Sequence, residues 1–308
     1  MAILAVGSIA FDTIKTPYGK KERVLGGSVT HFSLAASFFT EVRVVGVVGA
    51  DFTGEHEAVM TKCGIRTEGI QRAKGKTFHW SGEYGENLNE AKTNLTELNV
   101  FENFQPQIPK EFLDSDVLFL ANIDPVLQHG VRQQMPKVKL VGGDTMNFWI
   151  GGKRKELGET LKGIDVLLIN DGEAKLLAAD ASLSRAANKI LAMGPKAIVI
   201  KHGEYGATLF FKEGACGLAS GHPFRAPALP IEEVFDPTGA GDSFAGGFMG
   251  YIAAQPKITR DVLKRAMFYG GVMGSYAVEQ FGTERIQSLT RDEIEERFKI
   301  FQELTRLE

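Results

Sequence analysis

The stretch VFDPTGAGDSFAGGFMGYIAA, residues 234–254, places a glycine-rich turn directly before a predicted helix that starts near Asp242. Gly239 and Gly241 allow the backbone to turn so that successive N–H groups point toward one place. The start of the helix adds the positive end of its dipole. Gly239, Ala240 and Gly241 are therefore predicted to form an anion hole suited to a phosphate group.

Asp242 is a carboxylate beside this predicted anion hole, an unfavourable place for a negative charge unless it has a function. There it can accept the proton of an attacking hydroxyl and act as the base in phosphoryl transfer. The alternative is structural, because aspartate is also a good cap and dipole partner at a helix start. Farther along, Gly246, Gly247 and Gly250 each cost about 1 kcal/mol in a helix interior. We expect them to let this helix lie close against neighbouring backbone.

Short apolar runs that do not alternate polar and apolar residues precede this stretch, at 2–7, 42–49, 116–122, 138–144, 165–170 and 197–203. Such runs are typical of strands buried on both faces of a parallel sheet. Helix-like segments lie at 28–39, 54–63, 153–162, 172–193, 242–254, 260–279 and 290–306. The alternation predicts one α/β domain over residues 1–308, with a doubly wound, mostly parallel central sheet and helices on both faces.

Polar residues end four successive apolar runs, namely Asn122, Asp144, Asn170 with Glu173, and Lys201 with Gly203. In an open parallel sheet, ligands bind beyond the carboxyl ends of the strands. A single Asp or Asn at such a place is usually a helix cap. Four polar ends on one edge are harder to explain as caps, and they predict a polar crevice.

Two segments, at about 12–26 and 76–104, interrupt the alternation of strands and helices. Each is too polar for a central strand and is predicted to form two short strands, with turns near 18–21 and 82–89. We expect one small antiparallel sheet that lies over the main domain as a lid and closes on a substrate. The alternative is a pair of hairpins without a catalytic role, or a dimer contact.

The bulk composition excludes several classes of protein. The chain has 308 residues, 44% of them hydrophobic and 24% charged, and a formal net charge of −3, which offers no basic field for nucleic acid or an anionic membrane. It has no apolar run long enough to span a membrane and no basic n-region of a signal peptide. Cys63 and Cys216 are far apart and indicate neither a disulfide framework nor a zinc site, so a cytoplasmic protein is expected.

Residues 236–248, DPTGAGDSFAGGF, closely resemble the C-terminal signature of the ribokinase-like carbohydrate kinase family, which includes adenosine kinase and the minor phosphofructokinase. Further segments resemble family elements in the right order: GSIAFD (7–12), GGSVTHFSLAASFF (26–39), VGVVGADFTGE (45–55), INDGEAKLL (169–177) and KHGEYGATLF (201–210). The resemblance covers nearly the whole chain. It implies a ribokinase-like fold and transfer of the γ-phosphate of ATP, with Mg²⁺, to a hydroxyl of a sugar or a sugar-containing small molecule.

The resemblance also implies roles for individual residues. Asp242 would be the catalytic base beside the anion hole of residues 239–241. The acceptor would lie against Asp12, Gly26, Gly27 and His31, and ATP against Asn170, Lys201, Gly203, Gly206 and Thr238. Glu173 and Asn170 would organise Mg²⁺, largely through water, and Asp236 would belong to a site for a monovalent cation such as K⁺. Lids of this kind often pair between subunits, which implies a homodimer.

The chain departs from the family pattern at two places. His31 stands where the family usually has Asn, and it is either a histidine of a partly buried helix or an altered acceptor contact. The usual Asp-x-Asn-x-Arg element is replaced by DTMNFW (144–149), which has no arginine. The acceptor therefore stays open between a free sugar and a nucleoside.

Aromatic residues of the predicted lid bear on the same question. Phe78, Trp80 and Tyr84 can stack on the apolar face of a sugar or on a nucleobase. Alternatively, they pack the underside of the lid as alternate residues of a strand. A phosphorylated sugar is less favoured, because the lid side shows no arginine cluster.

Other classes of function were weighed against a kinase. A ligand-binding regulator with a kinase-like fold would bind without consuming ATP, but the presence of Asp242, the Gly-Ala-Gly turn, Asn170 and Glu173 argues against it. A nicotinamide-dependent oxidoreductase would need an early GxGxxG after a strand, and the chain has none. GxxxxGK[ST] is absent as well, so the predicted phosphate site is not a Walker-type loop.

Overall fold

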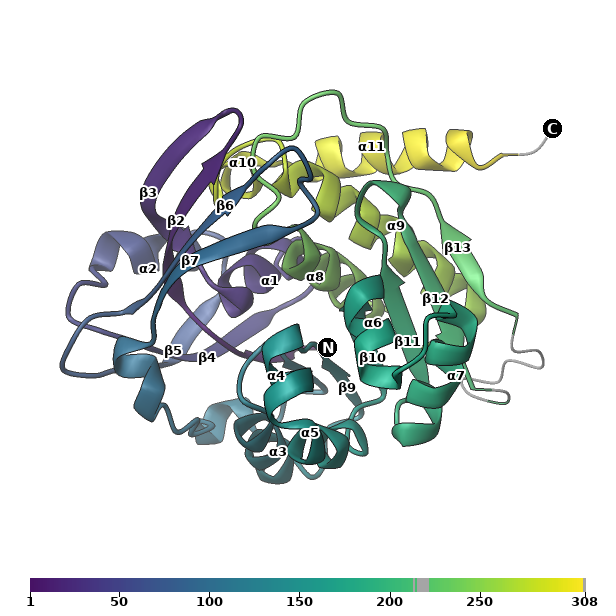
Figure 1. Ribbon diagram of the computed structural model, residues 1–308. Coiled ribbons are helices and arrows are strands. Elements are labelled where there is room, and N and C mark those ends of the chain that lie inside the picture. Colours follow the sequence, from purple (N-terminus) through teal and green to yellow (C-terminus); the bar gives the residue numbers. More distant parts are fainter. Residues whose placement is uncertain (213, 215–221, 307–308) are drawn as a thin grey trace.

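The computed structural model describes residues 1–212, 214 and 222–306; Cys216 lies outside them. A nine-stranded sheet with the order β13-β12-β11-β10-β9-β8-β1-β4-β5 forms the centre of the molecule (Figure 1). Its strands are β1 (Ile3–Val6), β4 (Val42–Val48), β5 (Arg66–Arg72), β8 (Val117–Leu120), β9 (Leu140–Gly143), β10 (Val166–Asn170), β11 (Ala197–Lys201), β12 (Ala207–Phe211) and β13 (Phe224–Ala226). All six predicted strands are present. The pairs from β5 to β11 are parallel, and β12 and β13 add an antiparallel edge.

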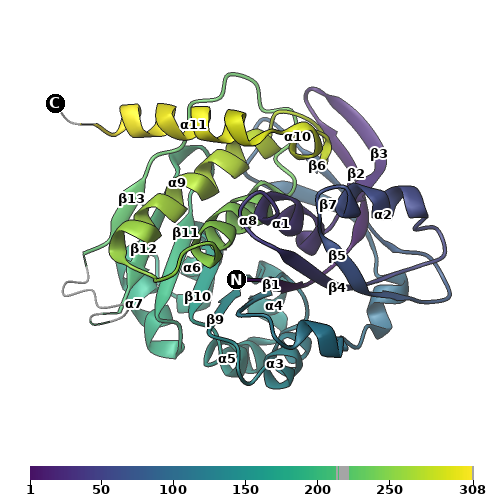
Figure 2. The ribbon, with the colours of Figure 1, turned by 180° about the vertical axis from the view of Figure 1, so that it is seen from behind.

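Helices cover both faces of this sheet, as predicted. Alternate residues of β1 belong to different cores, with Ile3 and Ala5 in one and Leu4 and Val6 in the other. The first core is closed by α1 (Ser28–Ala36), α2 (Gly54–Thr61), α8 (Ala240–Ala253), α9 (Arg260–Ala277), α10 (Glu284–Ser288) and α11 (Arg291–Leu304). The second is closed by α3 (Pro125–Gln134), α4 (Asn147–Gly152), α5 (Arg154–Leu161), α6 (Asp171–Ala178) and α7 (Leu183–Met193). Figure 2 shows α1, α8, α9 and α11 from the side that they cover.

The segment 172–193, predicted as one helix, is two helices, α6 and α7. Ala179 ends α6 in the left-handed conformation with φ 48°. Asp180 then accepts the N–H of Ser182 at 2.9 Å, which forms a tight turn before α7. The prediction of a single helix was wrong because the apolar periodicity continues across this turn, while the break depends on local hydrogen bonds.

The two insertions form a separate four-stranded sheet with the order β3-β2-β6-β7, which lies over the carboxyl ends of the central strands (Figure 1). Its strands are β2 (Ala10–Thr16), β3 (Gly19–Gly26), β6 (Phe78–Tyr84) and β7 (Ala91–Glu97). The two hairpins are antiparallel, but β2 and β6 pair in parallel, so the expectation of a purely antiparallel sheet was wrong. Both β2 and β6 follow parallel strands of the main sheet, so they leave it in the same direction.

The glycines within α8 lie against neighbouring backbone, as predicted. A Cβ on Gly246 would lie 2.3 Å from Phe32 O, and one on Gly247 would lie 2.6 Å from Tyr269 O. Helices α1 and α9 therefore pack directly on α8 and hold its N-terminus in place. None of the helices in the described part of the chain combines the length and apolarity that a membrane span requires.

Candidate active site

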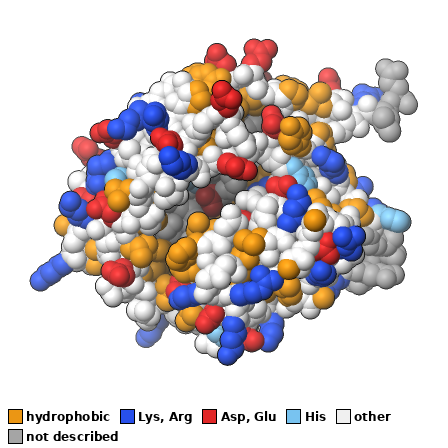
Figure 3. All heavy atoms as spheres, viewed as in Figure 1, with side chains coloured by type: hydrophobic (Ala, Val, Ile, Leu, Met, Phe, Trp, Pro, Cys, Tyr) orange, Lys and Arg blue, Asp and Glu red, His pale blue; other side chains and the backbone are white. Residues whose placement is uncertain are grey.

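The candidate site is a hollow between the lid and the carboxyl ends of the central strands. Figure 3 shows this hollow, with acidic side chains inside it. Asp144, Glu173 and Lys201, which lie at the ends of neighbouring strands, interact electrostatically with one another and with Asp242. The predicted polar crevice is therefore confirmed. Asn122 has a structural contact there, because its Oδ1 accepts an indole N–H from α4 at 3.1 Å.

The glycine-rich turn leads into α8, whose N-cap is Gly239. Gly239 has a φ of 73°, in the left-handed region that favours glycine. The N–H of Ala240 donates to Pro237 O at 3.2 Å and so belongs to the turn itself. The N–H groups of Gly241 and Asp242 have no acceptor among the described residues. Because the first N–H groups of a helix have no partner inside it, these two are left for a ligand.

Asp242 lies in the first turn of α8 and is partly buried. Burial, followed by the nearby carboxylate of Asp144, raises the pKa of Asp242 to about 8, although Lys201 opposes this shift. Asp12 and Glu173 raise the pKa further. A carboxylate with such a pKa is a stronger base than an ordinary aspartate, which suits it to accept the proton of a hydroxyl.

Lys201 and Asp144 form a buried ion pair at the ends of β11 and β9. The Lys201 Nζ lies 3.4 Å from Asp144 Oδ2, and the two side chains are 16% and 8% exposed. Burial alone would lower the pKa of Lys201, but the carboxylates of Asp144, Glu173 and Asp242 outweigh it and raise the pKa. A Cβ on Gly241 would lie 3.0 Å from Lys201 Nζ. The ammonium group therefore stands beside the free N–H groups at the start of α8, where it adds positive charge for a phosphate.

Asn170 and Glu173 form a capping box at the start of α6. The Asn170 Oδ1 accepts the N–H of Glu173, and Glu173 Oε2 accepts the N–H of Asn170, both at 2.8 Å. Burial and the neighbouring Asp144 raise the pKa of Glu173 to about 7. Glu173 Oε1 has no hydrogen-bond partner among the described residues. The described part of the chain contains no group of three or more His, Cys, Asp or Glu side chains that could hold a metal ion by themselves. This donor set fits Mg²⁺, which keeps several waters and binds through one or two carboxylates and substrate phosphates.

On the opposite side of Asp242, Asp12 and the Gly26-Gly27 pair lie together, as the resemblance implied. A Cβ on Gly26 would lie 1.9 Å from Asp12 Oδ2, so only glycine leaves room for this carboxylate. Burial raises the pKa of Asp12 to about 7, against a hydrogen bond from the N–H of Gly27. Gly27 is the N-cap of α1 and has a φ of 93°.

His31 lies in α1 directly against the glycine-rich turn. A Cβ on Gly239 would lie 2.3 Å from both Cγ and Nδ1 of the His31 ring. The ring is 2% exposed, and neither of its nitrogens has a hydrogen-bond partner among the described residues. Burial lowers the pKa of His31 to about 4, so the ring is neutral at physiological pH. A neutral imidazole with two free nitrogens beside the anion hole can either donate to or accept from a ligand.

Asp236 and Thr238 hold the turn before α8 in place. The two Asp236 oxygens accept the N–H groups of Thr238 and Gly282, each at 2.8 Å. Thr238 Oγ1 donates to the hydroxyl of Tyr84 at 3.2 Å, which links this turn to the lid.

Gly203 and Gly206 lie in the turn after β11, away from Asp242. A Cβ on Gly206 would lie 2.1 Å from Ala226 O, so this glycine is required by the packing of the turn on β13. Gly203 lies against Asn89 of the lid.

Some contacts that shape the site were not predicted from the sequence. Gln128 of α3 is fully buried, and its Nε2 donates to the carbonyls of Leu120, Ala121 and Asp144. It thereby joins the carboxyl ends of β8 and β9. Its helix was not predicted, although Asp124 and Pro125 form an ordinary N-terminal signal of cap followed by proline.

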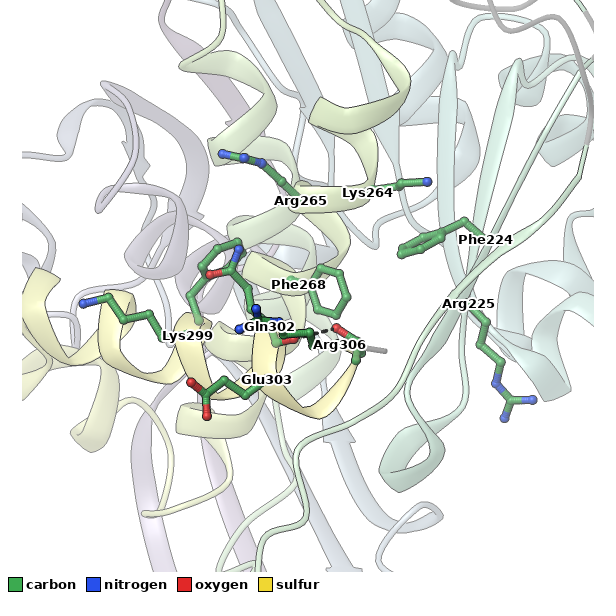
Figure 4. Close-up of a pocket in the computed structure, with 11 residues that line it drawn as sticks. Phe224, Arg225, Lys264, Arg265, Phe268, Lys299, Gln302, Glu303 and Arg306 are labelled. Carbon is green, nitrogen blue, oxygen red and sulfur yellow. Dashed lines mark hydrogen bonds between the residues drawn. The ribbon is translucent and has the colours of Figure 1, made fainter. Parts of the chain in front are cut away.

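A separate groove of about 770 Å³ lies between β13, α9 and α11 (Figure 4). Phe224 and Phe268 face each other across it with ring centroids 6.0 Å apart, and Lys264 lies at its edge. None of the residues at the candidate site lines this groove.

A model of the pfkB family of carbohydrate kinases matches residues 3–289. The chain belongs to this family. The predicted ribokinase-like membership is thus confirmed, and the protein is a phosphotransferase that acts on an alcohol group of a sugar or nucleoside. The family typically uses ATP and Mg²⁺.

Individual relatives of this kinase include both nucleoside and sugar kinases. A cytidine kinase of Thermococcus kodakarensis is 28% identical over 262 residues, which cover 82% of this chain and 90% of the relative. The solved nucleoside kinase of Burkholderia thailandensis in complex with inosine has a TM-score of 0.77 at 20% identity, covering 97% of this chain and 98% of that one. Ribokinase of Arabidopsis thaliana with ribose and ATP has a TM-score of 0.76 at 20% identity, covering 97% and 99%. At 20% identity, these structures show the common fold alone.

Proposed function

We propose that the protein is a nucleoside kinase, which transfers the γ-phosphoryl group of ATP to a ribose hydroxyl of a nucleoside. The observation that carries this proposal is the place of Asp242 at the start of α8, where it interacts electrostatically with both Lys201 and Asp12. From the sequence we expected a sugar or a sugar-containing small molecule as acceptor, with a nucleoside kinase as the alternative. The similarity to a cytidine kinase over 82% of the chain favours the nucleoside, which we had kept as the alternative.

In this mechanism, Asp12 and the Gly26-Gly27 pair hold hydroxyls of the acceptor, with His31 as a further contact. The carboxylate of Asp242 accepts the proton of the reacting hydroxyl, whose oxygen bonds to the γ-phosphorus. The bond from phosphorus to the bridging oxygen breaks, and that oxygen leaves with ADP. The N–H groups at the start of α8 and the Lys201 ammonium stabilise the charge on the transferring group.

The ATP phosphates lie along Lys201 and Thr238, and the turn with Gly203 and Gly206 borders the nucleotide. Mg²⁺, when bound, neutralises the phosphate oxygens, and Glu173 with Asn170 would hold it through water. Glu173 is suited to this because one of its oxygens is left over from the capping box. We also propose Asp236, whose carboxylate holds the N–H groups of Thr238 and Gly282, as part of a monovalent-cation site.

The inner face of the lid supports a nucleoside over a free sugar. Trp80 pairs in register with Asp12 across β2 and β6, so the two side chains point to the same face of the lid. Its ring covers Gly82, where a Cβ would lie 2.2 Å from Cη2. Its Nε1 donates to Thr93 at 3.2 Å, which fixes the plane of the indole. A fixed indole beside the acceptor carboxylate is a stacking surface for a nucleobase. Phe78 instead stacks on Phe101 at 5.4 Å, which agrees with a packing role for that ring.

The test is ATP consumption with a panel of nucleosides, pentoses and hexoses. We expect turnover with a nucleoside at a kcat/KM at least about tenfold above that with free ribose, since stacking of one base contributes about 1–3 kcal/mol. Better turnover of ribose or a hexose would return the assignment to a sugar kinase. Binding of these compounds without ATP consumption would instead indicate a ligand-binding regulator.

A homodimer through the lid is a further part of this proposal. All seven residues of β7 are exposed, and β7 is an edge of the lid sheet. An exposed edge strand offers unpaired N–H and C=O groups to a second copy of the chain.

A further inference from the structure

The β6–β7 hairpin reaches across the crevice from the acceptor side to the nucleotide side. Tyr84 is the last residue of β6, and its hydroxyl accepts a hydrogen bond from Thr238 Oγ1 at 3.2 Å. Thr238 directly precedes Gly239, the N-cap of α8. The lid thus makes a polar contact within the catalytic turn itself.

A second contact at the tip of the same hairpin fixes this position. Asn89 lies so close to Gly203 that a Cβ at residue 203 would be 1.9 Å from its Oδ1. The β2–β3 hairpin also contacts the main domain, because the ring centroids of Tyr18 and Phe235 are 5.1 Å apart. The lid is therefore closed over the crevice, with Tyr84 between the two sides.

The hydrogen-bond geometry leaves the proton of Tyr84 available. In the contact with Thr238, the Tyr84 oxygen is the acceptor, so its own O–H is not used there. Asp236, Asp12 and Asp242 interact electrostatically with this phenol, and none of them is hydrogen-bonded to it among the described residues. Burial, and then these carboxylates, raise the pKa of Tyr84 well above its usual value, so the phenol stays protonated and is a donor.

We propose that Tyr84 is an active-site residue supplied by the lid, which donates its hydroxyl proton to an oxygen of the bound reactants. The oxygen belongs either to the transferring phosphoryl group or to the acceptor, because Tyr84 lies between Asp12 on the acceptor side and the start of α8. Closure of the lid therefore adds a donor to the site in addition to excluding water. This inference rests on the proposed function, in that it needs a kinase with an acceptor under the lid.

The experiment compares Y84F with Y18F in the full-length protein. Each variant removes one lid hydroxyl and keeps the ring, but Tyr18 is 47% exposed and its hydroxyl has no hydrogen-bond partner in the described part of the chain. We expect Y84F to lower kcat/KM for the nucleoside by about tenfold to a hundredfold, as for the loss of a hydrogen bond to a charged or reacting oxygen. We expect Y18F to stay within twofold of the parent protein. Equal melting temperatures of the two variants would show that the lid is intact.

The kinetic constants then distinguish the two oxygens. A fall in kcat with unchanged KM places the bond on the transferring phosphoryl group, whereas a rise in KM for the nucleoside places it on the acceptor. If Y84F behaves like Y18F in kcat and in both KM values, the proposal is overturned.

Calorimetric titration with nucleoside and with ADP needs no turnover. If the parent protein consumes no ATP, the proposed function fails. Unchanged affinities of Y84F for both nucleoside and ADP then also overturn the role of Tyr84, whereas an affinity for either ligand weakened about tenfold keeps it as a donor to that ligand.

Discussion

The start of α8 and the lid line the same crevice but are built in opposite ways. Residues 243–250 of α8 are all buried, and backbone from two neighbouring helices lies against its glycines. In the lid, all seven residues of β7 and most of β3 are exposed. The lid reaches the site through a few side chains, among them Asp12, Trp80 and Tyr84. In the proposed mechanism, a rigid core therefore holds the groups of the chemical step, while a thin sheet presents the groups that recognise the acceptor.

The strongest test of this difference is a substitution of Asp242, the proposed base at the start of α8. D242N keeps the shape of the side chain but removes its basicity, so kcat should fall by about 10²–10⁴-fold. ADP affinity by calorimetry should persist. D261N, an aspartate in the first turn of α9, is the matched control and should leave kcat unchanged. Substantial turnover by D242N would show that another group is the base.

The second test concerns the rigidity of the turn itself. G239A forces a Cβ to within 2.3 Å of the His31 ring at a φ of 73°, so kcat/KM should fall by at least about tenfold and the protein should lose about 1–3 kcal/mol of stability. G158A in α5, where nothing lies within 4 Å, should be neutral or stabilising. Kinetics and thermal unfolding of both variants provide the measurement. A G239A protein as active and stable as G158A would contradict a rigid turn.

A substitution on the inner face of the lid should weaken binding of the acceptor and leave the chemical step unchanged. W80A should raise the KM for the nucleoside by about tenfold while the KM for ATP stays within twofold, because a stacked ring is lost on the acceptor side only. W80F keeps a ring and should recover most of the affinity. A change confined to the KM for ATP would place Trp80 on the wrong side of the crevice.

Stability should depend on pH through the buried carboxylates. Burial raises the pKa of Asp12 to about 7 and that of Asp242 to about 8, so the folded ligand-free protein binds protons that the unfolded chain has already released. Its stability should therefore fall as the pH rises from about 4 through 8. D242N should reduce this fall and melt higher than the parent protein at pH 8.5, by about 2–4 °C for each kcal/mol regained. Melting curves between pH 5 and 9 test this, and a parent protein that gains stability over this range would contradict the raised pKa values.

The smallest effect on activity should come from the outer edge of the lid. Leu95 of β7 is 46% exposed. L95K should therefore leave kcat/KM of the isolated subunit within about twofold, as expected of a surface site. If the lid joins two subunits, the same change should lower the mass measured by light scattering to that of one chain. T93K, on the same strand, is not a suitable control, because Thr93 accepts from Trp80. K92A is a suitable control for L95K, because Lys92 is an exposed surface cation.

Much of the fold could be predicted from local patterns. The six central strands were predicted because strands buried on both faces are continuously apolar. Helix α8 was predicted because a glycine-rich turn followed by Asp242 is typical of a helix start. The strands β5, β12 and β13 and the helices α3, α4 and α10 were not predicted. The patterns of β5, β13, α4 and α10 are polar or short, whereas β12 and α3 carry a signal that the prediction overlooked. At the site, Asp242 and the turn before it could be identified from residue type and spacing. The resemblance to a family then added Asp12, His31 and Glu173.

The sequence by itself determined the class of protein and the groups that carry charge, because residue types and their spacing are local properties. The tertiary structure alone decided which groups face one another. It paired Lys201 with Asp144 across β10, placed the His31 ring on Gly239, and brought Tyr84 to Thr238 from 154 residues away along the chain. It also decided the raised pKa values of Asp12 and Asp242, since burial depends on the packing of distant segments. Contacts of this kind depend on how the chain closes on itself, and no local pattern records them.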